Sequence, residues 1–108
     1  MRIITNFLQR QGSYHYEDDR LPIEILGLLR AITKRCRDVF AESACAANCG
    51  GGHEMFTQLD VSPPKGASII LNWPHSQFPG NKDLNSDLVY IVRMMLPPWA
   101  KDFDVVIT

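Results

Sequence analysis

The chain has 108 residues, 45% of them hydrophobic, and this length and composition suit one domain with a single core. Eleven basic and twelve acidic residues give a formal charge of -1, so no net field draws the chain toward nucleic acid or anionic lipid. No apolar run approaches the roughly 18 residues of a membrane span or forms a signal peptide, which predicts a cytoplasmic protein without a membrane partner.

The N-terminal half is predicted to contain one strand and one long helix. Residues 2–8, RIITNFL, alternate in the manner of a half-buried strand, and residues 9–19 are polar and indicate a loop. Pro22 suits the first turn of a helix that ends near Asn48. The apolar residues of this helix recur at helical spacing and share one stripe: Ile25, Leu28, Leu29, Ile32, Cys36, Val39, Phe40, Ala44, Ala46 and Ala47.

The C-terminal half is predicted to hold a hairpin, a second helix and a last strand. Residues 55–62 and 67–73 alternate on either side of a proline- and glycine-containing turn, and the helix over 83–96 ends before Pro97. Residues 102–108 have a strand pattern. The resulting order, βαββαβ, predicts a single α+β domain over residues 1–108 with a ferredoxin-like (split βαβ) antiparallel sheet and two helices on one face. A generic α+β sandwich is the alternative.

All three cysteines and one histidine fall within residues 36–53, with the spacing C-x8-C-x3-C-x3-H, which resembles a CCCH zinc finger. On one helix, however, Cys36 and Cys45 would lie on opposite sides and about 13 Å apart along the axis. Cys36 is therefore predicted to be buried in the apolar stripe. Cys45, Cys49 and His53 stay together as a candidate zinc site or oxidation sensor. The alternative is that both thiols pack under the glycine loop. An odd number of cysteines agrees with a reducing compartment.

Two segments resemble strand motifs of the RNA recognition motif family: KGASIILN, residues 65–72, and IITNF, residues 3–7. The resemblance implies an open sheet that could bind RNA. The positions that would stack on bases carry Ala67, Ile69 and Ile3 instead of aromatic residues, which argues against a stacking platform.

A basic flank is predicted on the first helix, where Arg30, Lys34 and Arg37 are four and three residues apart. Such a flank could contact phosphate groups or an acidic protein. The alternative is a solvated face of mixed charge.

A second candidate surface is the loop WPHSQFPGNK, residues 73–82, with Trp73, His75 and Phe78. Aromatic side chains on loops can anchor a protein partner, because they bury large areas at low entropic cost. Equally, Trp73 could close the end of the core. No nucleophile, phosphate loop or paired metal ligands accompany the histidines at 15 and 75 in sequence, which argues against an enzyme.

These observations favour a small, non-enzymatic domain that binds another protein, of the inhibitor, immunity or adaptor kind; an anti-defence inhibitor from a phage or mobile element is one example. The residues expected to contact the partner are Arg30, Lys34, Arg37, Trp73, His75 and Phe78. A nucleic-acid-binding module that uses the basic flank is one alternative. A zinc- or redox-responsive protein that uses Cys45, Cys49 and His53 is the other.

Overall fold

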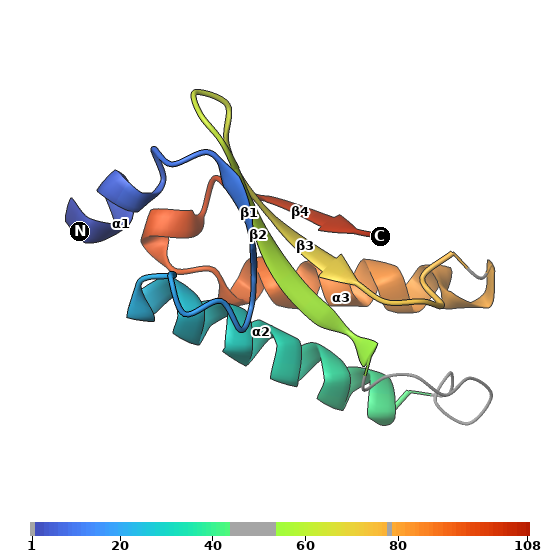
Figure 1. The fold of residues 1–108 in the computed structure, drawn as a ribbon. Coiled ribbons are helices and arrows are strands. Elements are labelled where there is room, and N and C mark those ends of the chain that lie inside the picture. Colours follow the sequence, from blue (N-terminus) through green and yellow to red (C-terminus); the bar gives the residue numbers. More distant parts are fainter. Residues whose placement is uncertain (1, 44–53, 78) are drawn as a thin grey trace.

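A four-stranded mixed sheet and three α-helices make up the described part of this computed structural model, which comprises residues 2–43, 54–77 and 79–108. The elements follow one another as α1 (Arg2–Phe7), β1 (Gly12–His15), α2 (Ile23–Ala41), β2 (Phe56–Ser62), β3 (Gly66–Asn72), the 3-10 turn η3 (Pro79–Asn81), α3 (Lys82–Met95), the 3-10 turn η4 (Pro98–Ala100) and β4 (Asp104–Ile107). Figure 1 shows the sheet above α2 and α3, with α1 at one end.

The strands lie side by side in chain order, β1-β2-β3-β4. Tyr14 of β1 pairs antiparallel with Leu59 of β2, and Leu59 pairs antiparallel with Ile69 of β3. Ile69 in turn pairs parallel with Val105 of β4. A parallel neighbour cannot be reached by a tight turn, so α3 forms the crossover between β3 and β4.

The core lies between one face of the sheet and the helices. Leu59, Ile69 and Leu71 alternate along β2 and β3 with half-buried residues, and they are fully buried. The apolar stripes of α2 and α3 pack against them in one cluster with Ile25, Leu29, Ile32, Cys36, Phe40, Leu84, Leu88 and Val92. No described helix lies over the opposite face of the sheet, the upper one in Figure 1.

The strand predicted over residues 2–8 is wrong, because this segment forms α1. Ile4 and Phe7 are three residues apart and both buried, which is the spacing of one helix face. The Phe7 ring packs on Tyr14, with 4.9 Å between centroids. The first strand is β1, within the segment predicted to be a loop. A six-residue helix contains too few apolar residues to distinguish the helical spacing from the alternation of a strand.

The single α+β domain is confirmed, but its ferredoxin-like arrangement is not. In a split βαβ unit, another strand separates the two strands that a helix joins. Here α2 joins the neighbours β1 and β2, and α3 joins the neighbours β3 and β4. The sheet is mixed rather than antiparallel, because β4 runs parallel to β3 while the other two strand pairs are antiparallel.

The hairpin, the second helix and the last strand are confirmed within a few residues. Pro97 follows the end of α3 at Met95 and Leu96, as expected for a residue that cannot continue a helix. The first long helix ends at Ala41 rather than near Asn48. None of the helices in the described ranges is both long and apolar enough to cross a bilayer.

Candidate functional site

The uncovered face of the sheet carries side chains from all four strands, and we call it the open face. Its residues alternate with the core residues: Ser13, His15, Phe56, Gln58, Asp60, Ser62, Ser68, Ile70, Asn72, Asp104 and Val106. Strand register arranges most of them in rows. The middle row places His15, Gln58, Ile70 and Val106 next to one another. Val106 is 41% exposed, whereas Ile70 is half-buried.

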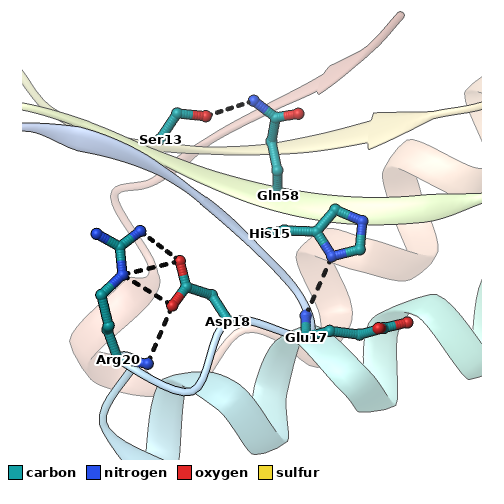
Figure 2. A network of polar contacts seen from close by, with 6 residues as sticks. All are labelled: Ser13, His15, Glu17, Asp18, Arg20 and Gln58. Carbon is teal, nitrogen blue, oxygen red and sulfur yellow. Dashed lines mark hydrogen bonds and ion pairs between the residues drawn. The ribbon is translucent and has the colours of Figure 1, made fainter.

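A chain of hydrogen bonds holds the polar side chains of this face in place. The Thr108 hydroxyl donates to Asn72 Oδ1 at 2.7 Å, and Asn72 Nδ2 donates to Gln58 Oε1 at 3.2 Å. Gln58 Nε2 then donates to Ser13 Oγ at 2.8 Å and to Asp60 Oδ1 at 3.1 Å, the first of which Figure 2 shows. These bonds fix both amide groups in one orientation.

Aromatic rings border the open face where β1 ends and β2 begins. The His15 ring stacks on Phe56, with 4.8 Å between centroids and 28° between planes, and its centroid lies 4.6 Å from that of Tyr16. His15 Nδ1 accepts a hydrogen bond from the Glu17 backbone N–H at 3.2 Å, as Figure 2 shows. When the ring is neutral, its proton is therefore on Nε2.

An ion pair organises the connection from β1 to α2. The Arg20 guanidinium donates to both carboxylate oxygens of Asp18, with 2.6 Å between Nη2 and Oδ2, and the Arg20 backbone N–H donates to Oδ1 at 3.0 Å (Figure 2). These hydrogen bonds from Arg20 lower the pKa of Asp18 to about 2. The pair is local, with Arg20 exposed and Asp18 half-buried, so it shapes the turn rather than the core.

The structure separates the three residues of the predicted basic flank. Arg30 is exposed, and Lys34 Nζ forms an exposed ion pair with Asp38 at 2.9 Å. Arg37 turns inward instead: its Nε donates to the Met55 carbonyl at 2.8 Å, and its guanidinium lies 5.8 Å from the centroid of the Tyr16 ring. Arg37 thus ties α2 to the start of β2, and only Arg30 and Lys34 present this flank to solvent.

The residues of the predicted aromatic loop also differ in their positions. Trp73 is only 3% exposed and meets the Phe40 ring edge-on at 5.3 Å, so it closes this end of the core. His75 is half-buried, and its carbonyl accepts a hydrogen bond from Asn81 Nδ2 at 2.7 Å. Phe78 lies outside the described residues. Partner binding by these loop residues stays a prediction.

The candidate metal ligands Cys45, Cys49 and His53 also lie outside the described residues, so the zinc site stays a prediction. Within the described ranges, no group of three or more His, Cys, Asp or Glu residues could hold a metal ion. Cys36 is fully buried in the core, and this burial raises the pKa of its thiol to about 12. Cys36 is therefore not a thiolate near neutral pH.

The positions at which an RNA recognition motif would stack bases do not lie on the open face. Ile69 faces the helices and is fully buried, and Ala67 lies on the same side of β3. Ile3 is part of α1. The aromatic residue that β2 and β3 bring to the open face is Phe56 instead.

Sequence reasoning missed a cavity of about 550 Å³ at the carboxyl ends of β3 and β4. Its described lining residues come from the loop after β3, the first turns of α3 and the end of β4: Ser76, Gln77, Lys82, Asn85, Ser86, Val89 and Ile107. The run of polar residues between a strand and a helix was the available signal. That run indicates a cavity only in combination with the parallel pairing of β3 and β4, which the sequence did not predict.

No protein-family model matches this chain, and neither the curated proteins nor the solved structures include a significant match.

Proposed function

We propose that this domain acts by binding another protein through the open face, in an inhibitor, immunity or adaptor role. The observation that carries the proposal is the apolar pair Ile70 and Val106 in the middle row, on a face that no described helix covers. Hydrogen-bonding side chains surround the pair. An apolar centre with a polar rim is the usual composition of a protein interface.

The hydrogen-bonded chain through Gln58 and Asn72 adds support. Ordering of flexible side chains opposes association, and this cost is smaller when the side chains are already held in one orientation. Gln58 is anchored to Ser13, Asp60 and Asn72 within the domain. The side chains of the open face are therefore preorganised for contact with a rigid partner surface.

The charges of the open face favour a protein over a nucleic acid. Asp60 and Asp104 lie in one cross-strand row with Ser68 between them, and the open-face set contains no lysine or arginine. Carboxylates repel phosphate, whereas they complement a basic side chain of a protein partner. The nucleic-acid alternative then depends on Arg30 and on Lys34, whose ammonium already pairs with Asp38.

Site-specific photo-crosslinking tests the proposal. A photoreactive residue replaces Val106 in one preparation and Arg30 in a matched control on the outer side of α2. Each preparation is irradiated in a native lysate. We expect the Val106 probe, but not the control, to capture one protein in stoichiometric yield. In a binding assay with the purified partner, Val106→Asp should weaken the affinity by at least about tenfold, because it places a charge in an apolar contact. Arg30→Ala should leave the affinity unchanged.

Two results would contradict this function. Capture only by the Arg30 probe would move the interface to the helices. Recovery of RNA or DNA whose binding weakens steeply with salt would favour the nucleic-acid module instead.

A further inference from the structure

The position of the cavity at the carboxyl ends of β3 and β4 is the first indication of its role. These two strands are parallel neighbours, and α3, which joins them, begins at the cavity with Lys82. In open sheets with parallel βαβ units, ligands bind just beyond the carboxyl ends of the strands, beside the start of a connecting helix. The cavity therefore has the location of a ligand site, on an end of the domain distinct from the open face.

Two polar groups at this junction lack hydrogen-bond partners. Ser76 is only 5% exposed and lines the cavity; its hydroxyl makes no hydrogen bond with any described residue and keeps some contact with solvent. Asn85 holds the loop by donating from Nδ2 to the Ser76 carbonyl at 2.6 Å. Its Oδ1 is buried and accepts no hydrogen bond in the described part of the chain. A buried acceptor without a partner is rare. The Ser76 hydroxyl can donate to a ligand oxygen, whereas Asn85 Oδ1 needs a donor, such as the hydroxyl of a singly protonated phosphate.

The charge at the cavity is positive. Lys82 is the one charged residue among its described lining residues, and it forms no ion pair within the described ranges. It is also the first residue of α3, where the helix dipole is positive. Asn81, which precedes it, makes no side-chain capping bond, and its Nδ2 donates to the His75 carbonyl. Asp83, in the first turn of α3, places one carboxylate near this positive end, but it is not among the residues that line the cavity.

The volume and the remaining wall indicate the rest of the ligand. About 550 Å³ lies within the range of small-molecule sites and is much larger than an inorganic phosphate ion needs. Val89 and Ile107 supply an apolar side to the cavity. Lysine and a helix N-terminus together are a common setting for phosphate. We propose that this cavity binds a small phosphate monoester, with the phosphate at Lys82 and Ser76 and the organic part against Val89 and Ile107.

Titration of the full chain with butyl phosphate tests the site, followed by amide chemical shifts in NMR at constant ionic strength. We expect saturable shifts at Ser76, Lys82 and Val89. Inorganic phosphate should bind at least about fivefold more weakly because it lacks the apolar part, and pentanoate at least about tenfold more weakly because it carries less charge. Equal affinity for pentanoate, or shifts that do not saturate, would overturn the assignment.

Matched lysine variants locate the phosphate. Lys82→Gln should weaken binding of butyl phosphate by about tenfold or more, whereas Lys101→Gln, at an exposed lysine outside the cavity, should not change it. Unchanged affinity in Lys82→Gln would contradict the site.

Ser76→Ala separates a ligand-binding role from a structural one. Since the hydroxyl has no partner among the described residues, the variant should melt at the same temperature as the wild type or higher, yet bind butyl phosphate about fivefold more weakly. A lower melting temperature with unchanged affinity would show that Ser76 serves the fold instead.

Discussion

The two faces of the sheet consist of alternate residues of the same strands, yet they are stabilised differently. On the covered face, Leu59 and Ile69 are fully buried, and the polar groups among them form a closed set. The Thr33 and Thr57 hydroxyls lie 2.7 Å apart, and each lies 2.9 Å from the Leu29 carbonyl oxygen. On the open face, a longer polar chain runs through the half-buried Gln58 and Asn72 to exposed side chains at both ends, where water can reach it.

The comparison shows where a polar hydrogen bond contributes to stability and where it can serve recognition instead. A polar group without a partner is costly in the dry core, so the threonines satisfy one another there. On the open face, water can replace a lost partner, so the same kind of bond contributes little to stability and can serve recognition. Substitutions on the two faces should therefore lower the free energy of unfolding by different amounts, even at neighbouring residues.

The largest effect is expected from Leu59→Ala, which leaves a cavity between the sheet and the helices. Loss of a buried leucine side chain typically lowers the free energy of unfolding by about 2–5 kcal/mol. Gln58→Ala, at the adjacent open-face position, should lower it by about 1 kcal/mol or less. Urea denaturation monitored by circular dichroism measures both. Equal losses at the two positions would contradict the distinction between the faces.

A smaller effect is expected from Thr57→Val, which keeps the shape of the side chain but removes its hydroxyl. The Thr33 hydroxyl and the Leu29 carbonyl each lose a partner in the core, so we expect a loss of about 1–3 kcal/mol in the free energy of unfolding. Thr33→Val and the double variant complete a cycle in the same denaturation assay. Because the two hydroxyls form one network, the double variant should lose less than the sum of the single losses; strict additivity would show that they act independently.

The smallest effect on stability is expected at the Asp18–Arg20 pair, which lies at the surface. The carboxyl carbon of Asp18, followed by NMR, should titrate near pH 2, and Arg20→Gln should raise the midpoint toward the ordinary value of 3.8. Since the folded pKa is below the unfolded one, the pair stabilises the fold above about pH 4, and this contribution is lost as the pH falls through about 2. A midpoint near 3.8 in the wild type would mean that the pair does not persist in solution.

The sequence by itself determined the elements that local chemistry encodes strongly. Strand alternation on both sides of the turn at residues 63–66 predicted β2 and β3, and Pro97 marked the end of α3. The apolar stripe of α2 correctly placed Cys36 in the core. These features depend on side-chain periodicity and on backbone restrictions within a few residues, so they can be recognised without a partner segment.

Only the tertiary structure decided which strand β4 joins, where β1 begins and which candidate residues reach the surface. Four residues become β1 because β2 supplies their hydrogen bonds, and their own sequence carries too weak a pattern to show it. The sequence predicted a surface position for Arg37 and left Trp73 open between a partner contact and the core. Met55 and Phe40, distant in sequence, hold the two side chains inward. The open face and the cavity likewise arise from strand neighbours and helix placement. Contacts between distant segments determine such features, and no local pattern records them.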